Sequence, residues 1–188
     1  MTNDISSTAT AAPLPIAPGQ WAMDPFHSAV NFTIRHLGIA KVRGRFGGVR
    51  AELFVGERIE DVRVSATIDL ASIDTGNADR DAHVRASDLL DVAKRPTMTY
   101  RSTRVRGEGE DWTMDGELTI GDVTRPVTLA VEFGGLGAMT AGGDGRHAGF
   151  EATGEIRRSQ FGLDFAPGLL GEVVKIQLDM QFVEPAAA

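Results

Sequence analysis

Apolar and polar residues alternate along most of the chain after residue 20. From Val62 to Leu70, for example, every second residue is apolar and the residues between them are polar. Similar alternation occupies residues 30–36, 42–55, 98–103, 112–120, 127–133, 150–156 and 174–182. A period of two is typical of β-strands with one buried face and one solvent face. We therefore predict about eight strands.

The connections between these runs are mostly short and contain glycine, as at Gly56-Glu57 and Gly121-Asp122. Short turns favour antiparallel pairing in a barrel or a sandwich. Every strand has an apolar face to bury, and a closed sheet of about eight strands does this without leaving exposed edges. The sequence therefore predicts an all-β fold, an eight-stranded antiparallel barrel. Gly47-Gly48 interrupts the run 42–55 and predicts a bend or bulge there.

The residues that this alternation turns inward are mostly apolar, but they include Gly44, Gly116, Ala152 and Gly154. Small inward residues leave space, which indicates a cavity inside the barrel. Glycine within a strand also marks a bend or a close backbone approach. Both interpretations stay open at these positions.

Three segments depart from the strand pattern. Residues 1–18 hold three of the eight prolines and many small residues, and they predict a disordered leader before a single barrel domain over residues 19–184. Residues 77–90 predict a short helix near one end of the barrel, because oppositely charged side chains lie four residues apart. The glycine-rich residues 134–145 predict a flexible hairpin connection or lid.

Composition excludes several classes of function. The 188 residues carry a net charge of −7, which argues against a nucleic-acid partner. The chain has no cysteine, so disulfides, thiolate metal sites and cysteine nucleophiles are excluded. No apolar stretch approaches the roughly 20 residues of a membrane helix, so we expect no integral membrane segment. The first 20 residues lack the basic and apolar regions of a secretory signal, which predicts a cytoplasmic protein.

Several motifs in register resemble one known family. They are Trp21-Ala22-Met23-Asp24-Pro25-Phe26-His27-Ser28, Val30 to Gly38, Val42-Arg43-Gly44-Arg45-Phe46, Ser72 to Asn77, Arg80 to Arg85, Gly116 to Ile120 with Val123 to Val127, and Arg157 to Leu163. In order and spacing the chain resembles the YceI-like family of lipid-binding proteins from about Trp21 to Phe182. The resemblance implies a lipocalin-like barrel with a long apolar tunnel. It further implies an isoprenoid or similar amphiphilic ligand such as a polyprenyl phosphate or quinone, a possible homodimer, and no established catalysis.

The inward residues of the predicted strands are then candidates for the tunnel wall. They are Phe32, Ile34, His36, Phe46, Val64, Ile68, Met98, Tyr100, Trp112, Met114, Leu129, Val131, Phe150, Ile176, Leu178 and Met180. Some of them must instead fill the core, and alternation alone does not separate the two groups.

The predicted helix supplies candidates for binding a polar head group. Asn77, Arg80, His83 and Arg85 lie there, and inward-facing His36 completes a hypothetical polar mouth. Hydrogen-bond donors near a helix N-terminus suit an anion such as a phosphate. The alternative is structural, with Arg80 and Arg85 fastening the helix by ion pairs. Their candidate partners are the carboxylates of Asp79, Asp81, Asp88 and Asp91.

Catalytic and metal sites have weaker support. The histidines His27, His36 and His83 show no metal-binding spacing, so we expect no metal and no cofactor, and we interpret His36 as a buried histidine bonded to a neighbouring strand. Hydrolase-like sets are Asp24, His27 and Ser28, or Ser159 with His147, and neither has a nucleophile elbow. We therefore predict non-catalytic binding and carriage of an isoprenoid lipid. The alternatives are an enzyme that acts on a small amphiphile inside the barrel, and a filled barrel that serves as a structural or dimerisation module.

Overall fold

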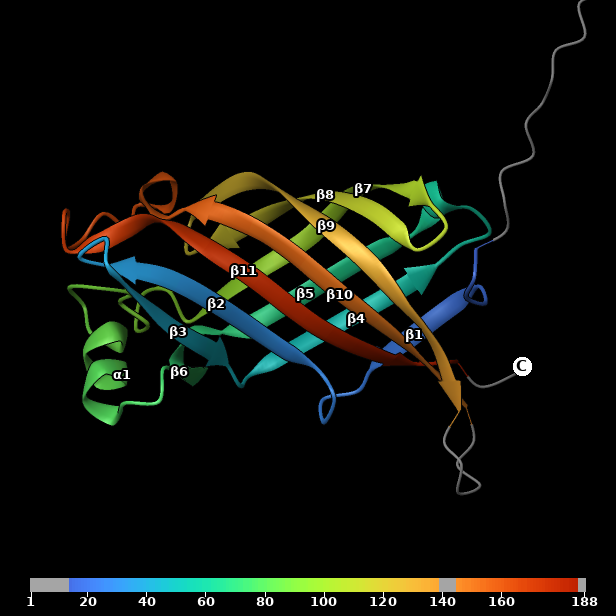
Figure 1. The fold of residues 1–188 in the computed structure, drawn as a ribbon, viewed down its shortest axis with the longest axis horizontal. Helices are drawn as coiled ribbons and strands as arrows, with labels where there is room; N and C mark the ends of the chain where they lie inside the picture. The colour runs from blue at the N-terminus through green and yellow to red at the C-terminus, as the bar shows by residue number, and fades with distance from the viewer. Residues whose placement is uncertain (1–13, 139–144, 186–188) are drawn as a thin grey trace, which may run out of the picture.

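The structure, a computed structural model, describes residues 14–138 and 145–185. It is an antiparallel β-barrel with one short α-helix at one end (Figure 1). The strands are β1 (Gly19–Met23), β2 (Ala29–His36), β3 (Ala40–Phe46), β4 (Val49–Val55), β5 (Arg63–Asp69), β6 (Ile73–Asp74), β7 (Thr97–Glu108), β8 (Asp111–Ile120), β9 (Val123–Ala138), β10 (Arg146–Arg157) and β11 (Leu170–Val183). The helix is α1 (Ala78–Arg85), and three 3₁₀ turns are η1 (Ile59–Asp61), η2 (Leu70–Ser72) and η3 (Arg158–Phe161).

Eight strands close the barrel. Hydrogen-bonded neighbours follow the order β1-β4-β5-β7-β8-β9-β10-β11, and β11 pairs back with β1. All of these pairings are antiparallel. Apart from β1 with β4 and the closing pair, the paired strands follow one another along the chain, with only the short β6 between β5 and β7. The predicted eight-stranded antiparallel barrel is confirmed.

The remaining strands extend the wall at one end. Two successive segments of residues 19–36 pair with β11. The last residues of β11 pair with β1, and residues 170–179 of β11 pair with β2. In the same way, β3 and β4 are two parts of the predicted run 42–55, and they are divided at Gly47-Gly48 as expected. The split directs β2 and β3 beyond the closed ring, where β3 also pairs with the short β6.

The packed part of the chain begins earlier than the predicted boundary at residue 19. Ile16 is buried, and the indole Nε1 of the fully buried Trp21 donates to the carbonyl of Ala17 at 2.9 Å. This contact attaches residues 16–18 to the end of the barrel near β1. The rest of the predicted disordered leader, residues 1–13, lies outside the described residues.

The other two irregular segments also differ in extent from their predictions. The helix ends at Arg85 instead of near residue 90, and the Ala86 amide donates to the carbonyl of His83 as the chain turns away. Of the predicted glycine-rich connection, residues 134–138 continue β9 in register with β10. Residues 139–144 lie outside the described residues, so the predicted lid cannot be placed.

Candidate functional site

The barrel encloses a cavity of about 450 Å³. Its wall is almost wholly apolar and is formed by residues from every strand of the described chain except β1. For comparison, an engineered apolar cavity of about 150 Å³ stays dry and binds benzene. The inward side chains therefore do not meet in the middle, and the structure does not favour the filled-barrel alternative.

All sixteen residues predicted for the tunnel, from Phe32 to Met180, lie in the wall of this cavity. Alternation identified them because each strand of a barrel turns every second residue inward. The wall also contains residues that the sequence analysis did not select. From the strands these include Val42, Ala51, Leu53, Leu118 and Val127.

The inward glycines are not the source of the cavity; of the two interpretations that were left open for them, the structure supports a close approach. A Cβ atom on Gly44 would lie 2.4 Å from Cζ of Phe32, and one on Gly116 would lie 2.4 Å from Cζ of Tyr100. At Gly154 the same position is 2.6 Å from Cδ2 of Leu129. Neighbouring side chains already fill the space beside these glycines. Of the four small residues, only Ala152 lines the cavity.

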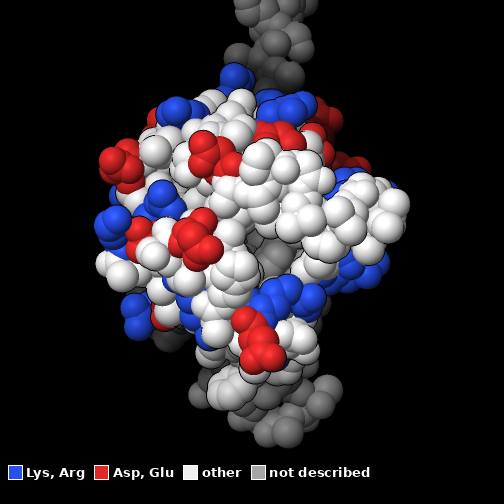
Figure 2. Space-filling view, turned by 90° about the vertical axis from the view of Figure 1, so that its left-hand side faces the viewer, with Lys and Arg blue, Asp and Glu red and all other residues white. Residues whose placement is uncertain are grey.

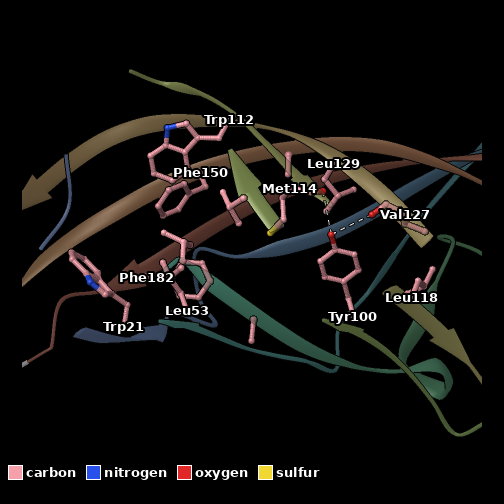
Figure 3. Close-up of a cluster of buried hydrophobic side chains, with 14 of the residues drawn as sticks. Trp21, Leu53, Tyr100, Trp112, Met114, Leu118, Val127, Leu129, Phe150 and Phe182 are labelled. Atoms are coloured by element: carbon pink, nitrogen blue, oxygen red, sulfur yellow. Dashed lines mark hydrogen bonds between the residues drawn. The ribbon is translucent and has the colours of Figure 1, made fainter. Parts of the chain in front are cut away.

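An aromatic cluster closes the tunnel at the β1 end (Figure 3). The rings of Trp112 and Phe133 stack with centroids 5.9 Å apart, and Phe150 lies 5.4 Å from Phe133 and 6.0 Å from Phe182. Trp112, Phe150 and Phe182 face the cavity, whereas Phe133 and the buried Trp21 pack behind them. The cavity is therefore a blind tunnel.

Tyr100 is a polar group inside this apolar wall. Its hydroxyl donates to the carbonyl oxygens of Met114 and Val127, at 3.3 and 3.4 Å (Figure 3). Burial raises the pKa of Tyr100, so the phenol stays neutral at physiological pH. The hydroxyl is occupied by the backbone, which leaves the ring as part of the apolar surface.

The open end of the tunnel lies beside α1, the β2–β3 hairpin and residues 158–170. Figure 2 shows this end as a hollow between largely uncharged residues, with Lys and Arg side chains beside it. The polar residues in this part of the wall are His36, Thr75, Arg80 and Arg158.

Arg158 is a buried cation at this mouth, with only 4% of its surface exposed. Its guanidinium donates to the carbonyls of Leu163 at 2.6 Å, Phe165 at 2.7 Å, Gly171 at 2.9 Å and Leu170 at 3.2 Å. It also lies 5.1 Å from the centroid of the Phe165 ring. Arg158 makes no ion pair with a carboxylate of the described chain. It holds residues 163–171 in the loop that borders the mouth.

Arg158 belongs to one of the motifs that carry the family resemblance, Arg157 to Leu163, but nothing in the sequence distinguished it from Arg157. It follows Arg157 at the end of a strand, and two adjacent arginines suggest a solvent-exposed pair. The structure exposes Arg157 and buries Arg158 because the chain turns into η3 at this point.

Two of the predicted head-group residues serve the helix itself. The Asn77 side chain accepts a hydrogen bond from the Arg80 amide at 2.9 Å and so caps the N-terminus of α1. His83 is exposed, and its Nε2 lies 3.2 Å from Oδ2 of Asp88. Neither residue reaches the tunnel wall.

The two arginines of the helix bind the chain that precedes it. Arg85 donates to the carbonyls of Ala71 and Ile73, both at 2.8 Å. Arg80 donates from Nε to Oγ1 of Thr75 at 2.7 Å and from Nη2 to the Thr75 carbonyl at 2.8 Å. The fastening role is present, but the partners are carbonyl and hydroxyl oxygens instead of the expected carboxylates. Of the four predicted head-group residues, only Arg80 lines the tunnel.

Comparison with known proteins assigns the fold and the family. The family model of the YceI-like domain matches residues 21–182. The chain belongs to the YceI-like family. Among curated relatives, the UPF0312 protein Ent638_1570 of Enterobacter sp. (strain 638) is 37% identical over 159 residues, which cover 84% of this chain and 82% of that protein.

Solved structures of YceI-like proteins share the barrel. The YceI protein of Campylobacter jejuni matches with a TM-score of 0.71 and 28% identity, covering 81% of this chain and 90% of the other. A polyisoprenoid-binding domain from Saccharophagus degradans, implicated in plant cell wall breakdown, matches with a TM-score of 0.67 and 16% identity. That match covers 90% of this chain and all of the other chain, and it shows that the two proteins share a fold.

The hydrolase-like residues of this YceI-like chain do not form a complete triad, although Asp24 and His27 are in contact. His27 Nδ1 lies 2.8 Å from Asp24, and this hydrogen bond lowers the Asp24 pKa. Ser28 instead exchanges hydrogen bonds with the backbone of Gln181, at 3.0 and 3.3 Å. Ser159 and His147 lie at opposite ends of β10.

His36 lies in the tunnel wall as predicted, but it lacks the hydrogen bond to a neighbouring strand that was also predicted for it. It is half-buried in the tunnel wall, and its imidazole makes no hydrogen bond to any residue in the described ranges.

Residues 14–138 and 145–185 contain no group of three potential metal ligands. In the same residues, no helix is long and apolar enough to cross a bilayer.

Proposed function

We propose that this YceI-like protein binds the apolar chain of an isoprenoid lipid in its tunnel and carries the lipid without altering it. The observation that carries the proposal is the blind cavity, whose wall is apolar along the barrel. The S. degradans domain, which shares this fold, is described as polyisoprenoid-binding and supports the same class of ligand.

The energetics favour a ligand whose long part is hydrocarbon. Removing apolar area from water contributes about 25 cal/mol per Å², so several isoprene units supply most of the affinity without polar contacts. A polar head group inside the tunnel would lose its hydration and find no partners, since Tyr100 is already bonded to the backbone. The tail therefore occupies the tunnel and the head stays at the mouth.

At the mouth, Arg80 and His36 are the groups that we propose for head-group binding. Arg80 uses Nε and Nη2 to hold Thr75, while its Nη1 makes no hydrogen bond within the described chain. The predicted binding roles of Asn77, His83 and Arg85 have less support, because these side chains are engaged elsewhere and lie outside the wall.

The test is lipid binding by the intact protein, measured by native mass spectrometry with a polyprenol and with the corresponding polyprenyl phosphate. Ala66→Phe places a ring in the tunnel and should weaken the binding of both lipids by about tenfold or more, because the tail loses the space it occupies. Thr67→Phe is the matched control, since the next residue of β5 faces solvent. Arg80→Ala should weaken binding of the phosphate and leave binding of the alcohol unchanged.

Three results would contradict the proposal. Equal binding by the Ala66→Phe and Thr67→Phe proteins would place the lipid outside the tunnel. Conversion of the lipid to a product during incubation would support the enzyme alternative. Absence of any bound lipid, with the fold intact by circular dichroism, would remove the carrier function.

A further inference from the structure

Large apolar side chains are exposed beside the tunnel mouth. Leu37 is 52% exposed, Ile39 81% and Leu169 46%, and together we call them the apolar lip. They come from two loops that are joined by a hydrogen bond of 2.7 Å from the Leu37 amide to the Leu169 carbonyl. The neighbouring residues His36 and Leu170 pair across β2 and β11 and line the tunnel. The lip therefore borders the opening directly, yet none of its three residues lines the tunnel.

The exposure of Leu37 is accompanied by an uncommon backbone conformation. Its φ of 54° lies in the left-handed region, where glycine or asparagine is favoured and a leucine is disfavoured. In the adjoining loop, Ala166 has a φ of 47°. A bulky apolar residue held in this conformation and exposed to water stabilises neither the turn nor the core. Such a residue suggests a function outside the isolated protein.

Basic residues flank the lip on the β2–β3 hairpin. Arg35 and Lys41 are exposed and lie opposite each other across the two strands, an arrangement of like charges that is unfavourable in water. Neither makes an ion pair within residues 14–138 and 145–185. Residues 35–41 and 162–170 contain a single acidic residue, Asp164, although the whole chain carries a net charge of −7. The hairpin is therefore locally basic on an acidic protein.

We propose that the apolar lip docks on the surface of a bilayer that contains anionic phospholipid. Leu37, Ile39 and Leu169 would enter the boundary between head groups and acyl chains, where apolar side chains leave water. Arg35 and Lys41 would lie at the level of the lipid phosphates, which relieves their mutual repulsion. Docking in this orientation brings the tunnel mouth against the membrane, so a lipid tail can pass into the tunnel without crossing water.

Vesicle co-flotation of the full chain tests this proposal. The wild-type protein should float with phosphatidylcholine vesicles that contain phosphatidylglycerol, and it should bind less to phosphatidylcholine alone or at high salt. The triple variant Leu37→Ser, Ile39→Ser, Leu169→Ser should lower the partition constant by about tenfold or more, because burial of even one such side chain is worth about that factor. Phe26→Ser is the control: Phe26 is 91% exposed but lies in the β1–β2 connection.

A second variant reports a gain of signal instead of a loss. Ile39→Trp should show a blue-shifted fluorescence emission when anionic vesicles are added, while Phe26→Trp should not. Equal flotation of wild-type and triple-variant proteins, or no shift for Ile39→Trp, would overturn the proposal. Self-association that depends on the lip, measured by light scattering and without vesicle binding, would instead assign the lip to a homodimer. Lipid binding measured without vesicles should be unchanged in the triple variant. This measurement distinguishes a failure of membrane docking from a failure of lipid binding in the tunnel, which is the proposed function.

Discussion

At the scale of single residues, Arg158 shows how a charge is kept inside an apolar protein. Burying a cation without a partner is costly, and here the guanidinium is satisfied by four backbone carbonyls instead of a carboxylate. These carbonyls belong to the chain between η3 and the first residues of β11, which includes left-handed positions at Gly162, Ala166 and Gly168. The Arg158 side chain thus donates hydrogen bonds to backbone carbonyls that would pair with a neighbouring strand in a regular part of the barrel.

This arrangement predicts that Arg158→Lys lowers the free energy of unfolding by about 2–4 kcal/mol. An ammonium group cannot reproduce the planar set of donors, and it leaves buried carbonyls unpaired. Arg157→Lys, at the exposed neighbouring position, should change that free energy by less than about 0.5 kcal/mol. Urea denaturation followed by tryptophan fluorescence measures both variants. Equal stability of the two variant proteins would show that the Arg158 hydrogen bonds do not hold the mouth.

At the scale of the strands, β7 shows why the inward face cannot be read by alternation alone. A bulge between Ser102 and Arg104 shifts the pairing with β8 by one residue. Strict alternation from Tyr100 would turn Arg104 inward, but the bulge places Val105 in the tunnel wall. The Ser102 hydroxyl, at the bulge, accepts a hydrogen bond of 2.8 Å from the Val64 amide of β5. The bulge therefore keeps charged residues of β7 on the outside.

The close packing of β8 against Tyr100 predicts a clear effect of Gly116→Ala. The added methyl group would meet the ring of Tyr100 and the carbonyl of Arg101, so unfolding should become easier by about 1–3 kcal/mol. Gly137→Ala on β9 is the control, because no atom of residues 14–138 or 145–185 lies within 4 Å of its Cβ position. Thermal denaturation should give a lower midpoint for the first variant only. A Gly116→Ala protein as stable as wild type would mean that the ring moves freely into the tunnel.

At the scale of the whole molecule, acidic side chains on the outside of the barrel connect its strands. Asp115 on β8 accepts a hydrogen bond of 2.7 Å from Thr128 on β9, and it forms an ion pair with Arg106 on β7. The Thr128 hydrogen bond, followed by the Arg106 contact, lowers the pKa of Asp115. Hydrogen bonds or ion pairs also lower the pKa values of Asp24, Glu60, Asp74, Glu172 and Glu184.

These lowered pKa values predict loss of stability in acid. A carboxyl group whose pKa is lower in the folded than in the unfolded chain stabilises the fold above its unfolded pKa, and that contribution is lost as the pH falls through the folded pKa. The free energy of unfolding should therefore decline below about pH 4. Asp115→Asn should make this decline shallower. Chemical denaturation of the wild-type and Asp115→Asn proteins at a series of pH values measures the free energy of unfolding of each. Identical slopes of this free energy against pH would contradict the stabilising role of the Asp115 carboxylate.

The sequence by itself determined most of the strands, the antiparallel barrel and sixteen residues of the tunnel wall. These follow from a repeated period of two, since each strand has a buried face that only a closed sheet covers completely. Gly47-Gly48 marked the point where one long strand divides, because two adjacent glycines interrupt the pattern. The sixteen predicted wall residues were selected from the same period of two. Alternation gives the side of the sheet on which a residue lies, so their positions could be predicted and their individual roles could not.

Only the tertiary structure decided that the barrel is hollow and where it opens. Whether inward side chains meet depends on the circumference of the barrel and on how rings such as Tyr100 lie over the glycines opposite them, and neither is encoded in local periodicity. The mouth is built from irregular segments, where Arg158, Thr75 and Phe165 converge from distant parts of the chain. Their positions are set by long-range hydrogen bonds and packing, for which the residues themselves carry no repeating signal.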